Sequence, residues 1–504
     1  MDPNTNWYRS TEQQLFAQIL MQHMARPDAP LLLEGGTGLG KTRAILHAIS
    51  NTSARIALVL PTHELMDQLL KSKDLSAIGL AVVDFRPRMM FDTEADYQAQ
   101  RQQAKDARVM LCTAASVIID QRLAGDYNGA TARDVLLFDE ADQLPDMAAL
   151  QSNFTIPAAA LQGKPIAAGL TALAKAGREV APETRAMAQI MVELLQNPVG
   201  YASVGLDEDG NAKLHHHLPG RLLKKLVNRP SSILVSATLS IRGEFSDFCR
   251  AMGIDSHSQR SRMIEPQRHG EVNFVVSPCE VDSDEWVANI VKTASQAIKP
   301  VLIATTSHET THRLQAAMDK IEGVLIKAAA WAGLDLASPP RTIIVPRIPF
   351  SQPVVIDSEV KTSYLSARST AERRLRQVLG RGLRSPDAKV SLHIMDGRVS
   401  GLYGFVPQRF KHAWPEMVEG ERQELILSKA ERDPRLRKAA LVLYGARCMA
   451  EGCHENQLHR LDIHHKDPIS EGIRRTRAED VMVLCKNHHA DAHFELKNSK
   501  NLDK

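Results

Sequence analysis

The chain has 504 residues, which is too long for one hydrophobic core of ordinary size, so roughly two to four domains are expected. Its 43% hydrophobic and 24% charged residues are typical of a soluble globular protein, and without a long apolar run we expect a cytoplasmic protein with no membrane partner. The formal net charge of +3 neither requires nor excludes nucleic acid, because a binding groove needs only local positive charge.

Short apolar runs alternate with helical stretches from residue 30 to about residue 140, and similar runs return after residue 230. This rhythm predicts an α/β fold with parallel, doubly wound sheets, in which each run is a buried strand. The predicted strands are Leu31–Leu33, Ile56–Leu60, Val109–Cys112, Val135–Phe138, Ile233–Val235, Val301–Ile303, Ile343–Val345 and Val390–Ile394.

The interval between the two sets of strands is expected to be mostly helical. It contains the triplet His215–His217, which no cysteine adjoins and which we interpret as a solvated loop rather than a metal patch. The expected segments are a first sheet domain (1–142 and 231–240), a helical insertion (143–230), a second sheet domain (241–414), a charged helical linker (415–440) and a C-terminal domain (441–504).

A glycine-rich segment follows the first predicted strand. Gly35 to Thr42 fits the pattern G-x-x-x-x-G-K-[ST], with Gly38 and Gly40 inside the loop. Such a loop points backbone N–H groups at phosphates, and the helix that follows adds positive potential. Lys41 would reach the β- and γ-phosphates of ATP, and the Thr42 hydroxyl would bind Mg²⁺. A glycine-rich turn without function is the alternative, and the strand–loop–helix context argues against it.

An acidic pair, Asp139 and Glu140, follows the predicted strand Val135–Phe138. The carboxyl ends of such strands are where ligands bind in parallel sheets. Asp139 would hold Mg²⁺, and Glu140 would orient and deprotonate the attacking water. A surface acidic turn is the alternative, but the phosphate loop earlier in the chain favours an ATP-hydrolysing site.

Further segments, in the order expected, resemble motifs of superfamily-2 helicases of the DinG/XPD branch. They are Tyr8-Arg9 with Gln13, Pro61-Thr62-His63-Glu64-Leu65 with Gln68, Ser236-Ala237-Thr238-Leu239, Pro346-Arg347-Ile348-Pro349-Phe350, and Gln377-Val378-Leu379-Gly380-Arg381-Gly382-Leu383-Arg384. The resemblance covers about residues 5–400. It implies two RecA-like motor domains with an arch-like insertion, and ATP-driven 5′→3′ movement on single-stranded DNA.

The resemblance also assigns Arg9, Gln13 and Gln377 to nucleotide binding. Arg381 and Arg384 lie at helical spacing on one face and would act as arginine fingers on the γ-phosphate. A basic helix that faces DNA is the alternative reading of this segment. The neighbouring arginines that would serve DNA in that case are Arg373, Arg374 and Arg376.

The chain departs from the family in three respects. The family often carries four cysteines for an iron–sulfur cluster, but only Cys112 lies between the phosphate loop and Asp139, so we expect no iron–sulfur cluster. Asp142 stands where DinG proteins usually have histidine. The interval from Asp142 to Ser236, where the family has its arch, is short.

Cysteines and histidines concentrate near the C-terminus. Cys448, Cys453, Cys485 and His488 form two short pairs, C-x4-C and C-x2-H, which predict a structural Zn²⁺ site. A module of about 60 residues needs such a metal site to fold stably, because its own hydrophobic core is small.

A second set of histidines, together with these pairs, resembles the ββα-metal fold of HNH endonucleases. The resemblance implies that His465 is the general base and that His464, His489 and His493 bind a divalent catalytic cation. Asp480 stands where the family has its middle asparagine, and His488 stands where cysteine is commoner. A zinc module that only binds DNA is the alternative.

A DinG-like motor joined to an HNH domain resembles the nuclease-fused DinG helicases of type IV-A CRISPR systems. The resemblance implies three partners, which are single-stranded DNA, double-stranded DNA and a crRNA-guided effector complex. One alternative is a helicase–nuclease of another phage-defence or DNA-repair system. The other is a protein that clamps DNA under the control of ATP and carries a non-catalytic zinc module.

Overall fold

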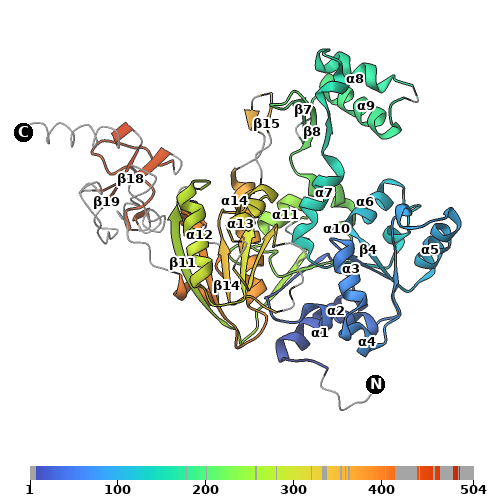
Figure 1. Cartoon of the computed structure of the whole chain (residues 1–504), viewed down its shortest axis with the longest axis horizontal. Coiled ribbons are helices and arrows are strands. Elements are labelled where there is room, and N and C mark those ends of the chain that lie inside the picture. Colours follow the sequence, from blue (N-terminus) through green and yellow to red (C-terminus); the bar gives the residue numbers. More distant parts are fainter. Residues whose placement is uncertain are drawn as a thin grey trace, which may run out of the picture.

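The computed structural model describes residues 7–414 and 440–488, apart from residues 178, 200, 256–257, 280, 319–320, 332–335, 337, 352–354, 358, 361–363, 403–404, 442, 458–459, 466–480 and 486. These residues form two α/β lobes, a smaller insertion and a C-terminal pair of strands (Figure 1). No helix in this part of the chain is long and apolar enough to span a bilayer.

Lobe 1 is built on a seven-stranded parallel sheet with the order β10-β1-β9-β5-β2-β4-β3. Its central strands are apolar and buried on both faces, as expected for a parallel sheet covered by helices. The strands are β1 (Leu31–Gly35), β2 (Ile56–Leu60), β3 (Val83–Asp84), β4 (Val109–Thr113), β5 (Val135–Phe138), β9 (Ser232–Ser236) and β10 (Arg260–Ile264).

Helices cover both faces of this sheet. Those that share an apolar core with one face are α1 (Thr11–Ala25), α2 (Lys41–Ser50), α3 (His63–Leu70) and α4 (Lys73–Ile78). Those on the other face are α5 (Glu94–Asp106), α6 (Ala114–Arg122), α7 (Leu144–Ser152), α10 (Lys224–Val227) and α11 (Ser246–Met252). Because β9 lies between β1 and β5, the segments that follow these three strands meet at one edge of the sheet.

Lobe 2 is built on a five-stranded parallel sheet with the order β11-β17-β14-β12-β13. The strands are β11 (Glu271–Cys279), β12 (Val301–Thr305), β13 (Val324–Ala328), β14 (Thr342–Val345) and β17 (Lys389–Asp396). The cores on its two faces contain α12 (Asp284–Gln296) and α13 (His308–Ala317) on one side and α14 (Tyr364–Gly382) on the other. The parallel sheets predicted from the apolar runs are therefore confirmed in both lobes.

The insertion contains a sheet that was not predicted. Strands β6 (Phe154–Ile156), β8 (Ala212–His216) and β7 (Ala202–Leu206) form an antiparallel sheet in that order. Alternating apolar residues of this sheet pack on α8 (Ile166–Ala174) and α9 (Pro182–Gln196). The mostly helical description is therefore incomplete, and the solvated-loop interpretation of His215–His217 is wrong, since His215 and His216 lie in β8.

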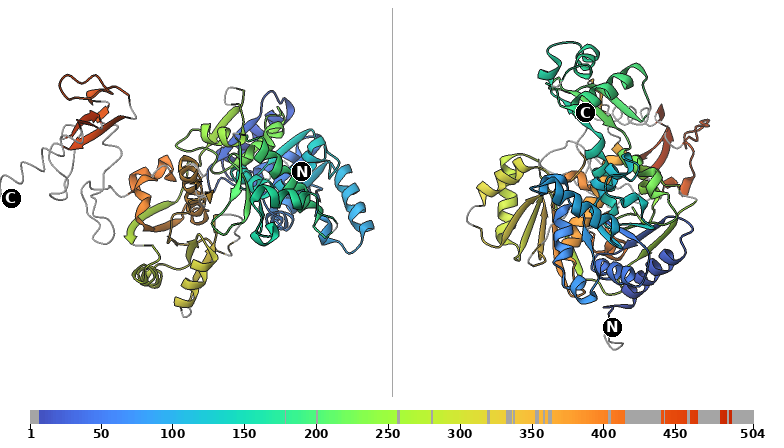
Figure 2. Two further views of the ribbon diagram at one scale, coloured as in Figure 1. Left: turned by 90° about the horizontal axis from the view of Figure 1, so that it is seen from above. Right: turned by 90° about the vertical axis from the view of Figure 1, so that its right-hand side faces the viewer.

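The C-terminal residues that the structure describes form a separate small core. Strands β18 (Leu461–His465) and β19 (Val481–Cys485) pair antiparallel, and their apolar residues pack with Ala440 and Cys448. Figure 2 shows this pair of strands away from the two lobes. The expected linker at 415–440 lies outside the described residues except for Ala440.

Candidate functional site

The phosphate loop connects β1 to α2. Gly38 and Gly40 have positive φ values of 86° and 78°, a backbone conformation that a residue with a Cβ rarely adopts. The loop therefore needs glycine at these two positions to turn sharply before α2 begins at Lys41. The Lys41 ammonium donates to the Gly35 carbonyl at 3.3 Å, so it lies over the loop where phosphates would bind.

The side chain of Gln13, on α1, contacts this loop. Its side-chain amide donates to the Gly40 carbonyl at 2.9 Å and accepts the Arg9 backbone N–H at 2.7 Å. Gln13 is fully buried at the start of α1, whereas Arg9 is exposed beside it. Gln13 thus contacts the phosphate loop, and the Arg9 backbone contacts Gln13.

The acidic pair lies at the carboxyl end of β5. Burial and the neighbouring Glu140 raise the pKa of Asp139 to about 7, while Lys41 opposes the shift. A divalent cation bound beside these carboxylates would favour their charged form. The Asp139 carboxylate and the Thr42 hydroxyl offer oxygen atoms of the kind that Mg²⁺ prefers, so these residue types fit the predicted site. The Ser236 hydroxyl donates to Glu140 at 3.3 Å from the end of β9.

Asp142, where the family usually has histidine, connects three segments. It accepts the Ser236 hydroxyl at 2.5 Å and the Thr238 hydroxyl at 2.6 Å. The side-chain amide of Gln377, on α14 of lobe 2, also donates to it. Burial and Glu140 raise the pKa of Asp142 to about 6. Asp142 therefore joins the acidic segment to Ser236-Ala237-Thr238-Leu239 and to the arginine-rich helix.

Helix α14 places lobe 2 against the phosphate loop. A Cβ on Gly380 would come within 2.4 Å of the Thr37 side chain, so the helix backbone approaches the loop closely. The cleft between them has a volume of about 190 Å³. It is lined by Thr37, Gly38, Lys41, Leu65, Glu140, Gln143, Ala237, Trp331, Gln377, Gly380, Arg381 and Arg384. The cleft thus combines the phosphate loop and Glu140 of lobe 1 with both predicted arginine fingers of lobe 2.

Three further arginines of α14 bind lobe 1 directly. Arg373 pairs with Asp247 at 2.8 Å, Arg374 with Asp146 at 3.1 Å, and Arg376 with Glu34 at 3.1 Å. An arginine paired with a carboxylate forms a pair without net charge, which attracts a DNA phosphate less than a free arginine does. These three contacts therefore argue against the alternative of a DNA-facing helix, and they hold the two lobes together.

Two residues of the cleft region were not predicted from the sequence. Trp331 lines the cleft, and its carbonyl accepts a hydrogen bond from the Arg381 guanidinium at 2.8 Å. Glu34 is 1% exposed inside β1 and accepts the backbone N–H of Ser240. Two features of the sequence could have indicated these residues. Tryptophan is rare, with 4 in the chain, and Glu34 is one acid in an otherwise apolar strand.

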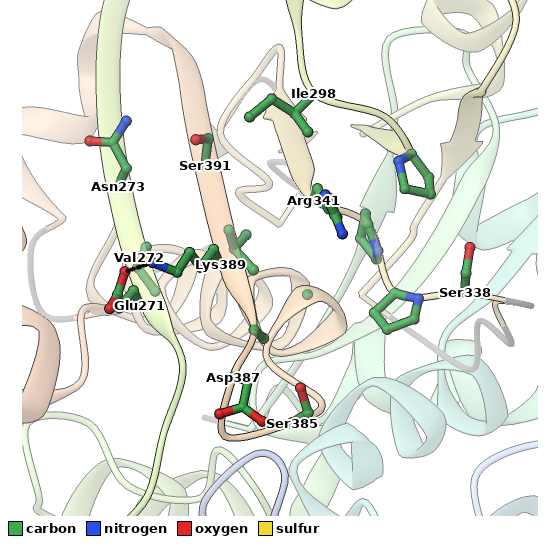
Figure 3. Close-up of a pocket in the computed structure, with 16 residues that line it drawn as sticks. Glu271, Val272, Asn273, Ile298, Ser338, Arg341, Ser385, Asp387, Lys389 and Ser391 are labelled. Atoms are coloured by element: carbon green, nitrogen blue, oxygen red, sulfur yellow. Dashed lines mark ion pairs between the residues drawn. The ribbon is translucent and has the colours of Figure 1, made fainter.

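A larger cavity of about 810 Å³ lies at the amino ends of the lobe 2 strands (Figure 3). The ion pair between Lys389 and Glu271, 3.0 Å apart, and the side chain of Arg341 border it. None of the predicted site residues lines this cavity. Ligands of such sheets bind at the carboxyl ends of the strands, so we place the functional site in the smaller cleft.

The predicted zinc ligands come together in the C-terminal module. One ligand atom from each of Cys448, Cys453, Cys485 and His488 lies within 4.8 Å of the others. The Nδ1 atom of His488 is 3.2 Å from the Cys485 sulfur and 3.6 Å from the Cys448 sulfur. Three thiols and one imidazole this close together fit a tetrahedral Zn²⁺ site.

The second histidine set is only partly described. His464 is buried in β18, and His465 ends the same strand. Asp480, His489 and His493 lie outside the described residues. The structure therefore leaves the expected catalytic cation site untested.

The chain is similar to one protein family over part of its length and to several solved structures over most of it. Residues 8–175 match the family "Type III restriction enzyme, res subunit". An apo form of XPD matches with a TM-score of 0.54 and 15% identity, covering 78% of this chain and 97% of that structure. An XPD helicase matches with a TM-score of 0.54 and 14% identity, over 78% of this chain and 97% of its own.

A third structure, Xpd4 from S. tokodaii, has a TM-score of 0.50 and 13% identity, with 79% of this chain and 99% of that chain covered. No curated protein matches the chain. At these identities the comparison concerns the fold, and the α/β core with its parallel sheets resembles that of the XPD structures.

Proposed function

We propose that the chain is an ATP-driven helicase of the DinG/XPD type that moves 5′→3′ on single-stranded DNA. One observation carries the proposal, namely that the cleft between the lobes is lined by groups from both of them. Lys41 and Glu140 come from lobe 1, and Arg381 and Arg384 come from lobe 2. A hydrolytic site divided in this way is complete only when the lobes are together, which couples hydrolysis to lobe movement.

Each residue of the cleft has a definite role in this proposal. Lys41 and the loop N–H groups bind the phosphates, and Thr42 and Asp139 hold Mg²⁺, which neutralises phosphate charge when bound. Glu140 orients the attacking water and accepts its proton. Arg381 and Arg384 stabilise the charge that develops on the γ-phosphate. When that charge leaves with the product, the contacts of α14 with the loop weaken and the lobes can separate.

We further propose that the C-terminal module is an HNH-type DNA endonuclease. Its support is the antiparallel pair of β18 and β19, with His464 and His465 on one strand and the Cys/His cluster beside it. His465 is the general base, and His464, His489 and His493 bind the catalytic cation. Asp480 would accept an imidazole N–H bond in place of the asparagine amide oxygen.

The combination of motor and nuclease resembles the nuclease-fused DinG helicases of type IV-A CRISPR systems. On this basis we place the protein with a crRNA-guided complex that opens DNA, so that the motor unwinds the DNA and the nuclease cuts it. The second candidate is a helicase–nuclease of another defence or repair system. Copurification with a crRNA-binding complex distinguishes the two, because only the first requires it.

The motor is tested by the rate of ATP hydrolysis with and without single-stranded DNA. We expect DNA to increase the rate at least tenfold and Lys41→Ala to abolish it, because the Lys41 ammonium lies over the phosphate loop where it would bind the β- and γ-phosphates. Lys164→Ala, on the exposed surface of the insertion, is the matched control. A rate that DNA does not change contradicts the motor and favours an ATP-controlled clamp.

A further inference from the structure

Two pairs of rings lie at one end of the insertion sheet. We call Tyr201, His215, His216 and His217 the ring cluster. The rings of Tyr201 and His216 are stacked, with centroids 6.3 Å apart and planes at 21°. Those of His215 and His217 lie 5.7 Å apart at 40°. Tyr201 is 60% exposed and is the only aromatic residue among the exposed large apolar side chains of the described chain.

The sheet holds these rings in place by its backbone. The His217 N–H donates to the Tyr201 carbonyl at 3.0 Å, and the His216 N–H donates to the Asn153 side chain at 2.9 Å. The His217 ring lies 2.7 Å from the Ser203 hydroxyl. The insertion's apolar core lies farther along β8, where Ala212 and Leu214 pack with α8 and α9. The ring cluster is therefore an ordered surface feature outside that core.

The chemistry of the cluster points away from metals and phosphates. Among the described residues, only the C-terminal Cys/His cluster brings three or more potential metal ligands together. Burial and the adjacent His217 lower the pKa of His215 to about 4, and burial also lowers the pKa of His216. Neutral rings attract phosphate weakly, but imidazole and phenol faces stack well on nucleic-acid bases.

The insertion sheet is connected to both lobes. A hairpin of lobe 2, β15 (Val355–Ile356) with β16 (Glu359–Val360), contacts β7 (Figure 1). Asp357 donates its N–H to the Leu206 carbonyl at 2.8 Å and accepts the Leu206 N–H at 2.9 Å. A Cβ on Gly205 would collide with Ile356 and Asp357, so the contact is close. The sheet is thus joined to lobe 1 through the chain and to lobe 2 through the hairpin.

We propose that Tyr201, with the His216 ring stacked on it, is a stacking platform for the bases of single-stranded DNA. The proposal rests on the proposed DNA motor and adds a binding site to it. An unpaired strand exposes base faces that aromatic and imidazole rings can cover, whereas a duplex hides them. Tyr201, as the exposed ring, makes the outermost contact, and the His216 ring of β8, which is stacked on it, supports it.

The test compares binding of a fluorescent single-stranded oligonucleotide with binding of an abasic strand of equal length. We expect Tyr201→Ala to raise the Kd for the normal oligonucleotide about tenfold, which is what about 1.4 kcal/mol of lost stacking gives. Tyr201→Phe keeps the ring and should bind as the wild type does. On the abasic strand all three proteins should have the same Kd. His312→Ala, an exposed histidine on α13, is the control and should change nothing.

The outcomes separate this site from the motor. An unchanged Kd in Tyr201→Ala, or an equal loss in Tyr201→Phe, overturns the platform even when DNA stimulates ATP hydrolysis. A loss that is as large on the abasic strand overturns it too, because stacking needs bases. If Tyr201→Ala binds weakly but DNA does not stimulate hydrolysis in the wild type, the platform stands and the motor fails. Thermal unfolding of each variant checks that it is folded.

Discussion

Arg376 of α14 forms an ion pair with Glu34 of β1, with 3.1 Å between Nη1 and Oε1. Glu34 is almost completely buried and immediately precedes Gly35, the first residue of the phosphate loop. Burial raises the pKa of Glu34, and Arg376 opposes that shift. The pair therefore connects the helix that carries Arg381 and ends just before Arg384 to the backbone that would bind ATP.

Glu34→Gln should weaken the closed arrangement of the lobes. The substitution leaves the Arg376 guanidinium poorly compensated, and removal of one partner of a buried ion pair costs about 3–5 kcal/mol. Opening of the lobes would relieve part of this cost by hydrating Arg376. We therefore expect the KM for ATP to rise at least tenfold in steady-state hydrolysis assays, since the closed state is less populated.

The double substitution Glu34→Gln with Arg376→Met distinguishes this coupling from two separate losses. If the residues act through each other, the double variant is less impaired than the sum of the single variants, with a coupling of about 1 kcal/mol or more. Additive effects would mean that the ion pair does not connect the lobes during turnover.

Arg381→Ala and Arg384→Ala should each lower kcat about a thousandfold, because an arginine finger acts mainly on charge that develops in the transition state. The KM for ATP should change much less. Arg313→Ala on the outer helix α13, where Arg313 pairs with Asp284, is the matched control. An Arg381 variant with normal kcat and a raised KM would show that this residue only positions the Trp331 loop.

The acidic pair predicts how stability depends on pH without nucleotide. The pKa of Asp139 is raised to about 7, above its usual value, so the folded protein holds this proton more tightly than the unfolded chain. The free energy of unfolding should therefore fall as pH rises from about 4 to about 7. Asp139→Asn should flatten that slope in Tm measurements. Equal slopes in the two proteins would refute the assignment.

Much of the fold followed from local patterns. Buried parallel strands such as β1 and β5 are continuous apolar runs, so the sequence shows them directly. Strands β7 and β8 were missed because polar and apolar residues alternate there over only five positions, and the histidines resembled a loop. Short alternation of this kind depends on the helices that cover one face, which local sequence does not reveal.

The candidate site was predictable where a motif fixes both residue type and spacing, as in Gly35 to Thr42. The contacts of α14 were not, because the partners of Arg373, Arg374 and Arg376 lie in another lobe. The sequence of an arginine-rich helix is the same kind of pattern whether the helix faces DNA or carboxylates, so the sequence alone does not identify its partner. Only the folded arrangement shows that Asp247, Asp146 and Glu34 face it.

The zinc site is tested by metal content. We expect about one zinc per chain, because three thiolates and one imidazole complete a tetrahedral site. Cys453→Ser should remove the metal and destabilise the C-terminal module, since metal binding contributes to folding in small modules. Cys279→Ser, a buried cysteine of lobe 2, is the control. Zinc that persists in Cys453→Ser would contradict the four-ligand assignment.

The nuclease and its dependence on the motor are tested together. His465→Ala should abolish metal-dependent DNA cleavage and leave DNA-stimulated ATP hydrolysis intact, because the base acts only at the phosphodiester. Lys41→Ala should reduce degradation far from the loading site more than local nicking, because only translocation requires ATP. Cleavage is measured on long duplexes labelled at both ends. Equal cleavage by His465→Ala refutes its role as the base, and unchanged long-range degradation by Lys41→Ala shows that the motor does not supply DNA to the nuclease.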